Sequence, residues 1–467
     1  MSGNHLFEEK TYAARRKRLQ QAIPSGIILL MGNEESPCNY ADNVYPFRQD
    51  SNFLYFLGID KPGLAAIIDI DAGKTILFGD DPDIMHIVWM GALPSMAELA
   101  AAAGGADTAS YAQIESYLAE ARSKGRFIHY LPPYRADNSI KLSRWLGISL
   151  DGLAAGASVP LIEAVVAQRS CKSDEEIAEM EKAVNTSGLM HLAAMKAARA
   201  GRKEYELVGL VESIARAGGG GLPYTVILSV NGQILHNHYY GNTLQSGQLV
   251  LGDFGADTAM HYAGDITRTF PVDQKFTARQ KEIYQIVLDT EVAAIQSLKP
   301  GVRYLDVHLA ASRHIAEGLK SLGLMKGDLD EAVAAGAHAL FFPHGLGHMI
   351  GLDVHDMEDL GENYVGYGNE LIRSTQFGLR SLRLARTLEP GFVLTVEPGI
   401  YFIPELINLW RKENLHTEFI NYDKLEAYFD FGGIRIEDNV LITTEGHRVL
   451  GNPIPKTLAE VEALRIG

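Results

Sequence analysis

The chain has 467 residues, of which 46% are hydrophobic and 21% charged, so at about 150 residues per domain it can form two or three domains. This composition excludes a collagen-like, low-complexity or intrinsically disordered chain. The 42 basic and 58 acidic residues give a net charge of −16, which argues against nucleic acid or an anionic membrane as the main partner. The two cysteines, Cys38 and Cys171, make no disulfide framework and fit a reducing compartment.

The first twenty residues are polar and charged, without the apolar core of a signal peptide. The longest apolar runs, such as residues 27–31, are the size of a strand and far shorter than the roughly 20 residues that span a bilayer. We therefore expect a cytoplasmic protein.

Strands and helices alternate through the first third of the chain, which is typical of an α/β layer domain. A new helix is expected after Ser173, because a Ser cap is followed there by carboxylates in the first turn. We therefore predict an N-terminal domain over residues 1–170 and a second domain over residues 171–467. The pattern predicts N-terminal strands over 26–32, 52–57, 64–69 and 127–131, and helices over 96–103 and 111–121.

Two aspartates belong to a predicted hairpin in the second half of the chain. The apolar run 248–253 ends on Asp253, and alternation along the run 262–270 puts Asp265 on the same face as Thr267. A turn-sized stretch separates the runs, so the hairpin would hold the two aspartates close together. Two buried neighbouring carboxylates repel each other and need a proton or a cation, unless both are exposed residues at strand ends.

Three histidines, His344, His348 and His355, fall within twelve residues. The spacing of four between the first two suits a zinc-binding helix, but the glutamate that follows the first histidine in that motif is missing. Gly345 and Gly347 favour a loop or a strand instead. A single histidine is more often a core residue, whereas three together among glycines and apolar residues indicate chemistry.

Two further segments place carboxylates on predicted strands. Glu397 closes an apolar run, and Arg435 and Glu437 share one face of the run 432–438. An inward-facing Arg and Glu are costly unless they find partners. Together these segments supply four carboxylates and a histidine, a set that suits two hard or borderline divalent ions. Two ions about 3.5–4 Å apart can activate water and polarise a carbonyl, so we predict metal-assisted hydrolysis.

This combination of segments resembles the M24 metallopeptidases, the pita-bread family of methionine aminopeptidase, aminopeptidase P and prolidase. The resemblance covers nearly the whole chain and implies an α/β N-terminal domain followed by an α+β pita-bread catalytic domain. Its aspartates are twelve residues apart, one more than is usual in the family, which suggests a slightly longer turn. The metal ligands that it implies are Asp253, Asp265, His348, Glu397 and Glu437.

The resemblance to the proline-specific branch also assigns roles beside the ligands. It implies proton transfer by Glu397 with help from His344, and stabilisation of the oxyanion by His355. His236 and Arg383 would hold the proline end of the substrate, and an arginine can bind a carboxylate as a fork.

Three further residues complete the implied substrate side. Tyr224 matches a family tyrosine, although it lies two residues closer to His236 than is usual. Trp89 matches a tryptophan that reaches the active site of the partner subunit. Arg435 is expected to support Glu437 or Asp253 rather than to touch the substrate.

Two features favour prolidase within the family. Arg383 lies in Arg-Ser-Leu-Arg-Leu-Ala-Arg at 380–386, on the arginine that holds a dipeptide's carboxylate, and the stretch 397–437 is long and begins as in prolidases. We therefore predict hydrolysis of Xaa-Pro dipeptides, with an Xaa-Pro aminopeptidase acting on longer peptides as the alternative. A non-catalytic creatinase-like domain that binds peptides or proteins is more distant, because the ligand set is complete. A phosphotriesterase side activity stays open.

The resemblance and the oxygen-rich ligands predict two divalent ions, Mn²⁺ first, with Co²⁺, Zn²⁺ or Fe²⁺ as alternatives. The expected substrate is a small peptide with proline in the second position, and we expect no nucleic-acid or membrane partner. A homodimer follows if Trp89 works across a subunit interface, and a tetramer is the alternative.

Overall fold

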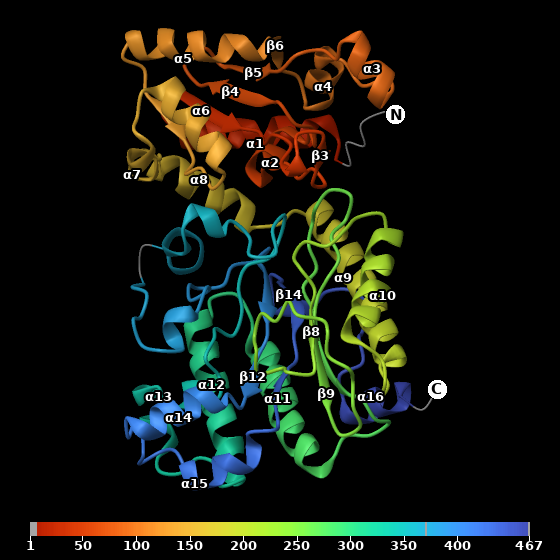
Figure 1. Cartoon of the computed structure of the whole chain (residues 1–467). Helices are drawn as coiled ribbons and strands as arrows, with labels where there is room; N and C mark the ends of the chain where they lie inside the picture. The colour runs from red at the N-terminus through yellow and green to blue at the C-terminus, as the bar shows by residue number, and fades with distance from the viewer. Residues whose placement is uncertain (1–6, 369–370, 466–467) are drawn as a thin grey trace. The chain divides into compact units, whose positions relative to one another are not determined.

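The computed structural model describes residues 7–368 and 371–465, and the chain divides into two compact units (Figure 1). The first unit holds Met1–Arg169 and Met357–Tyr364, and the second holds Ser170–Asp356 and Val365–Gly467. Within the described residues, no single helix has the length and apolar composition to cross a membrane. Two helices that meet at a bend, Leu150–Gly156 and Val159–Ser170, have sufficient length and apolar composition only when they are taken together.

A mixed five-stranded sheet of order β6-β5-β4-β1-β7 forms the centre of the first unit. Strand β1 pairs antiparallel with β4 and parallel with β7. The strands are β1 Ile27–Met31, β4 Ala65–Asp69, β5 Lys74–Phe78, β6 Asp107–Ala109 and β7 Ile128–Tyr130, with β2 Pro37–Tyr40 and β3 Asn43–Val44 in a separate hairpin. The helices are α1 Glu9–Ala22, α2 Ser51–Leu57, α3 Ile84–Met90, α4 Met96–Ala102, α5 Ile114–Ser123, α6 Ala136–Leu146, α7 Leu153–Gly156 and α8 Val159–Ser170.

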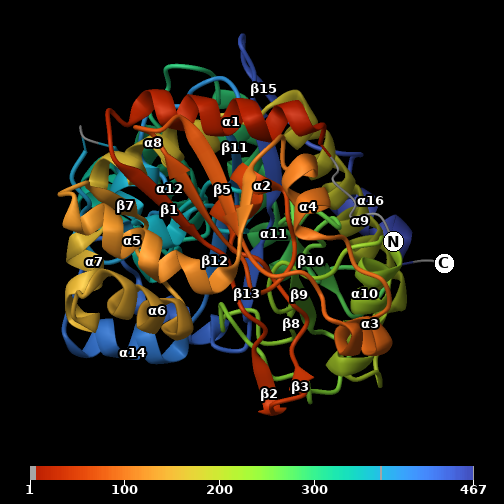
Figure 2. The same ribbon diagram turned by 90° about the horizontal axis from the view of Figure 1, so that it is seen from above.

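Alternate residues of this sheet point into one hydrophobic core. Ile27 and Leu29 of β1 and Ile67 of β4 pack there with Leu118 of α5 and Trp145 of α6. Figure 2 shows α1 on one side of the sheet and α5 and α6 on the other. The strands predicted over 26–32, 64–69 and 127–131 and the helices over 96–103 and 111–121 are confirmed, within one to three residues at their ends.

The prediction of a strand over 52–57 is wrong, because these residues form helix α2. The carboxylate of Asp50 accepts hydrogen bonds from the backbone N–H groups of Asn52 and Phe53, which caps the helix. Gly58, with φ of 70°, ends it in the left-handed conformation. Residues 53–57 are all buried, so no polar position marks a helical period.

Short antiparallel sheets and long helices build the second unit. The sheet orders are β10-β9-β8, β11-β14-β15 and β12-β13. The strands are β8 Ile227–Ser229, β9 Leu249–Asp253, β10 Thr267–Pro271, β11 Val393–Val396, β12 Gly399–Tyr401, β13 Gly433–Arg435, β14 Asp438–Ile442 and β15 His447–Val449. The helices are α9 Asp174–Ala197, α10 Glu204–Ala217, α11 Ala278–Ser297, α12 Tyr304–Ser321, α13 Leu329–Ala335, α14 Pro404–Lys412, α15 Tyr422–Leu425 and α16 Leu458–Leu464.

Single β-bridges join the sheets of the second unit where the site lies. Thr267 of β10 bridges to Glu437, and Met349 bridges to Leu394 of β11. Figures 1 and 2 both show α9 and α10 on one side of the strands and α12 on the other. The sequence-predicted start of α9 is confirmed, because Ser173 and Glu176 form a capping box.

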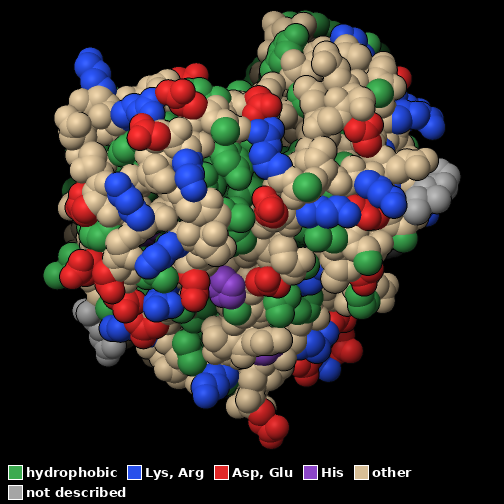
Figure 3. Space-filling model, turned by 90° about the horizontal axis from the view of Figure 1, so that it is seen from below, with side chains coloured by type: hydrophobic (Ala, Val, Ile, Leu, Met, Phe, Trp, Pro, Cys, Tyr) green, Lys and Arg blue, Asp and Glu red, His purple; other side chains and the backbone are tan. Residues whose placement is uncertain are grey.

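Figure 3 shows one face of the molecule, on which basic and acidic side chains are interspersed. This face carries no continuous basic surface of the kind that tracks a nucleic-acid backbone.

Candidate active site

The two aspartates lie where the predicted hairpin puts them. β9 and β10 pair antiparallel, with Thr267 opposite Asp253. Asp265 lies two residues before β10 rather than within it. The side chain of Asn439 holds its backbone: Asp265 N–H donates to Asn439 Oδ1 at 2.9 Å, and Asn439 Nδ2 donates to Asp265 O at 2.7 Å.

Tyr224 links the two aspartates. Its hydroxyl lies 3.0 Å from Asp253 Oδ1 and is also hydrogen-bonded to Asp265 Oδ1. Burial and the neighbouring carboxylates raise the pKa of Tyr224 well above its ordinary value, so the hydroxyl keeps its proton and donates it. This side chain therefore binds both aspartates.

His348 and Glu397 are placed by a loop that runs beside β11. The backbone N–H of His348 donates to Thr395 Oγ1 at 3.0 Å, and that of Glu397 donates to Leu346 O at 2.8 Å. The Nδ1 of His348 lies 3.0 Å from Met349 O, which assigns the proton to Nδ1. Its Nε2 then faces Asp265 Oδ2 at 3.4 Å and Glu397 Oε1 at 3.6 Å. The predicted non-helical setting is confirmed.

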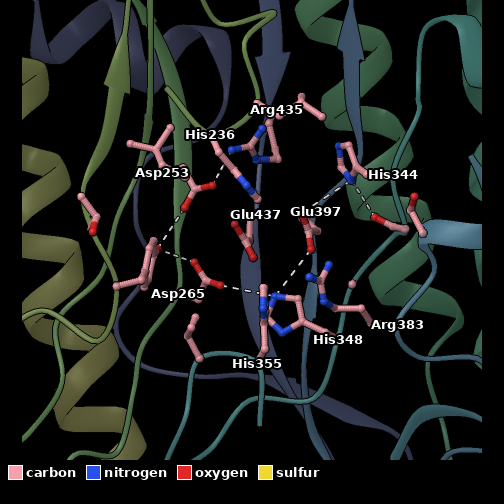
Figure 4. Close-up of a pocket in the computed structure, with 18 of the residues that line it drawn as sticks. His236, Asp253, Asp265, His344, His348, His355, Arg383, Glu397, Arg435 and Glu437 are labelled. Atoms are coloured by element: carbon pink, nitrogen blue, oxygen red, sulfur yellow. Dashed lines mark hydrogen bonds and ion pairs between the residues drawn. The ribbon is translucent and has the colours of Figure 1, made fainter. Parts of the chain in front are cut away.

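Glu437 completes the group, from the residues between β13 and β14. Its Oε2 accepts a hydrogen bond from Thr267 Oγ1 at 2.6 Å. Its Oε1 is buried and has no hydrogen-bond partner among the described residues. Ligand atoms of Asp265, His348 and Glu437 all lie within 4.8 Å of one another. Figure 4 shows their side chains turned toward a common centre with Glu397.

The electrostatics of this group call for cations. Burial raises the pKa of Asp265. Burial together with the neighbouring carboxylates raises the pKa of Asp253, and it raises that of Glu437 well above its ordinary value. The pKa of Glu397 is raised to about 8 for the same reason. Four ionised carboxylates at this depth repel one another, and divalent ions bound by oxygen and imidazole ligands would remove that repulsion. The residues present therefore fit the implied ions.

Arg435 connects the carboxylates to a tyrosine and a histidine. Its buried guanidinium is bonded to Asp253 Oδ2, and it donates to Thr267 Oγ1 at 3.2 Å and to the Tyr401 hydroxyl at 2.7 Å. The Tyr401 hydroxyl lies 2.8 Å from His344 Nε2 and donates to it. Burial and the charge of Arg435 lower the pKa of His344 to about 3, so this imidazole is neutral.

Tyr401 is a residue of the site that was not predicted from the sequence. The residue lies on β12, which pairs with β13 so that Gly399 stands opposite Arg435. Residues two apart on a strand share a face, so the sequence could have placed Tyr401 on the face of Gly399. Since Gly399 stands opposite Arg435, this is also the face of Arg435.

The four carboxylates, His344, His348 and Arg435 line one cavity of about 480 Å³, within the usual size of small-ligand sites. His236, His355 and Arg383 line the same cavity as the carboxylates (Figure 4). Burial lowers the pKa of His236. The sequence-predicted residues that line it are Tyr224, His236, Asp253, Asp265, His344, His348, His355, Arg383, Glu397, Arg435 and Glu437.

Trp89 belongs to the first unit and lies on helix α3, among whose residues none is buried. Its side chain is 79% exposed.

Known proteins are similar to this chain over most of its length. The pattern of metallopeptidase family M24 matches residues 178–444, and that of the aminopeptidase P N-terminal domain matches residues 12–129. The human Xaa-Pro dipeptidase is 35% identical over 97% of this chain and 91% of its own length.

Solved structures are similar over the whole chain. Aminopeptidase P of E. coli, with the inhibitor Pro-Leu, has a TM-score of 0.81 at 30% identity, with 98% of each chain covered. Aminopeptidase PepP of Pseudomonas aeruginosa has a TM-score of 0.80 at 31% identity, again with 98% of each chain covered. The chain therefore belongs to metallopeptidase family M24 and carries its pita-bread catalytic fold behind an aminopeptidase P-type N-terminal domain.

Proposed function

We propose that this metallopeptidase hydrolyses the Xaa-Pro bond of dipeptides. The observation that carries the proposal is that Arg383 and His236 lie in the same small cavity as the four carboxylates of the site. An arginine there can bind the carboxylate that a dipeptide carries on its proline. The similarity to the human Xaa-Pro dipeptidase over nearly the full length supports the same conclusion.

The proposed ligands are four carboxylates and one histidine, which would hold two divalent ions. When bound, such ions supply a hydroxide nucleophile at neutral pH and polarise the scissile carbonyl. We propose Mn²⁺, with Co²⁺, Zn²⁺ or Fe²⁺ as alternatives. One solved E. coli aminopeptidase P is described as zinc-substituted, so a relative's site accepts Zn²⁺. The ligands are Asp253, Asp265, His348, Glu397 and Glu437.

Glu397 would move the proton of the reaction. Its Oε2 lies 3.7 Å from His344 Nδ1, and its Oε1 lies 3.6 Å from His348 Nε2. From this position the carboxylate can take a proton from the attacking water and return it to the proline nitrogen as the bond breaks. His344 is held by Tyr401 and can assist this transfer.

The remaining residues of the cavity would orient the substrate. Proline has no amide N–H, so its ring and its carboxylate are what the enzyme can recognise. We assign these to His236 and Arg383, and the developing oxyanion to His355. Arg435 is bonded to Asp253, Thr267 and Tyr401, so we assign it to holding these groups rather than the substrate.

The experiment that tests the proposal compares a dipeptide with a tripeptide. Hydrolysis of Gly-Pro and of Gly-Pro-Ala is measured on the purified chain, after chelation, and after Mn²⁺ is added back. We expect the dipeptide to be the better substrate, with its turnover lost on chelation and restored by Mn²⁺. Faster turnover of the tripeptide would make the chain an Xaa-Pro aminopeptidase, and a different metal giving full activity would overturn the proposal of Mn²⁺.

We further propose a homodimer in the cytoplasm, with a tetramer as the alternative. The exposed Trp89 on α3 supports a contact between copies. Sedimentation of the wild type and of Trp89→Ala tests the dimer, and fractionation of cells tests the location. A wild-type chain that sediments as a monomer would overturn this proposal.

A further inference from the structure

A buried ion pair lies beside the proposed oxyanion group, and the mechanism does not use it. Lys172 Nζ lies 3.0 Å from Asp356 Oδ2, and each side chain is only 1% exposed. Asp356 directly follows His355 in the chain. Removing a lysine and an aspartate from water costs several kcal/mol per ion, which their attraction does not always repay. A pair this deep therefore needs a reason beyond stability.

Asp356 closes the loop that carries His355. Its backbone N–H donates to Met349 O at 2.9 Å, and Gly351 N–H donates to Asp353 O at 3.0 Å, so the loop folds back on itself. The imidazole of His355 meets that of His348 edge to face, with ring centres 4.4 Å apart. The backbone of His355 is thus fixed on its C-terminal side by the residue that binds Lys172.

Lys172 is itself anchored at the start of helix α9. Its backbone N–H donates to Gly391 O at 2.8 Å, in the turn that leads into β11. One turn into the helix, Glu176 Oε1 accepts a hydrogen bond from the Tyr262 hydroxyl at 3.0 Å. The next residue of the hairpin, Ala263, donates from its backbone N–H to Gly351 O at 2.8 Å.

The space between these segments is filled. A Cβ on Gly351 would lie 2.6 Å from Asp356 Oδ2 and 3.0 Å from Lys172 Cε. The start of α9 therefore holds both the segment before Asp265 and the loop of His355, with the ion pair at the point where they meet.

We propose that the Lys172–Asp356 ion pair is a positioning device that fixes the His355 loop, and with it the imidazole that stabilises the oxyanion. Both residues act through His355 and neither touches the substrate. This inference rests on the proposed function, because it takes the role of His355 from there.

The test replaces each member of the pair and measures Gly-Pro hydrolysis by the metal-loaded enzyme. Lys172→Met removes the ammonium and keeps the length of the side chain. We expect kcat to fall about 10- to 100-fold, the loss typical of a catalytic group misplaced by about 1 Å, with KM within about threefold and metal content unchanged. Asp356→Asn keeps the side-chain volume and the oxygen that accepts a hydrogen bond from the backbone N–H of Asp353. This variant is measured instead if Lys172→Met does not fold. The control is Lys182→Met on helix α9, which begins two residues after Lys172; there the exposed ammonium pairs with Glu179.

A double mutant separates positioning from a general structural effect. In a His355→Ala background the pair has no imidazole to position, so Lys172→Met should lower kcat by less than about threefold. An equal loss in both backgrounds would overturn the inference, as would a single mutant with unchanged kcat. If His355→Ala alone leaves kcat unchanged, it is the proposed role of His355 that fails.

Discussion

Arg383 gives the most direct test of how the cavity selects its substrate. Two arginines line the cavity, and the donors of Arg435 are engaged by Asp253, Thr267 and Tyr401. Leu382 and Leu384, on either side of Arg383, are fully buried. Arg383 also lines the cavity, and it is the arginine to which we assign the substrate carboxylate.

Arg383→Met removes this cation and keeps most of the side chain's apolar length. A hydrogen bond to a charged group contributes about 1.5–3 kcal/mol. At about 1.4 kcal/mol per factor of ten, kcat/KM for Gly-Pro should fall about 10- to 150-fold. Gly-Pro-amide has no carboxylate at that position, so its kcat/KM should change by less than about threefold.

The assay measures initial rates on both substrates at saturating Mn²⁺, for the wild type, Arg383→Met and a control. The control is Arg380→Met, in the same segment, where the exposed guanidinium lies over the ring of Phe377. Equal losses on dipeptide and amide would refute the reasoning, because the effect would then come from the site's structure and not from the carboxylate. An unchanged rate on Gly-Pro would also refute it.

Three further predictions follow from described contacts. Asp265→Asn should lower the rate of Gly-Pro hydrolysis at least about 100-fold, and it should also lower the metal content measured by mass spectrometry. Hydrolysis at the wild-type rate would contradict a two-ion site. Tyr401→Phe removes the bonds to His344 and Arg435, so kcat should fall about 10- to 100-fold with KM little changed; an unaltered kcat would remove the tyrosine from the mechanism. Burial alone would raise the pKa of Asp69, but hydrogen bonds from Arg126, from a tyrosine and from the backbone lower it to about 2. Asp69→Asn should therefore cost about 1–2 kcal/mol of unfolding free energy at pH 7, and in denaturant titrations this cost should shrink between about pH 4 and pH 2. A cost that is constant with pH would show that the carboxylate's charge is not responsible.

The parts of the site that follow local rules could be predicted from the sequence. Period-two alternation predicted a hairpin with Asp265 and Thr267 on one face, and β9 and β10 do pair antiparallel, with Thr267 opposite Asp253. Gly345 and Gly347 correctly excluded a helix around His348. A Cβ on Gly347 would collide with the carbonyl of Thr395, which is why the loop can lie so close to β11.

The parts that depend on contacts between distant segments could not be predicted. Asn439 is hydrogen-bonded to the backbone of Asp265, 174 residues away in the sequence, and no local sequence pattern predicts such a pairing. Tyr401 meets Arg435 only because β12 pairs with β13. Helix α2 was not predicted because nearly all of its residues are buried, so its sequence has no periodic polar face.

The spread of the site along the sequence has a consequence for synthesis of the protein. The cavity draws on residues from Tyr224 to Glu437, and Arg268 binds the carbonyls of both Glu437 and Ile454. The buried core cluster of the first unit is drawn from residues 27–153, so it can form while translation continues. The nascent chain gains all five proposed ligands only after residue 437 has left the ribosome. Chains that end before Glu437 would lack one of the proposed metal ligands, so we expect them not to hydrolyse Xaa-Pro peptides.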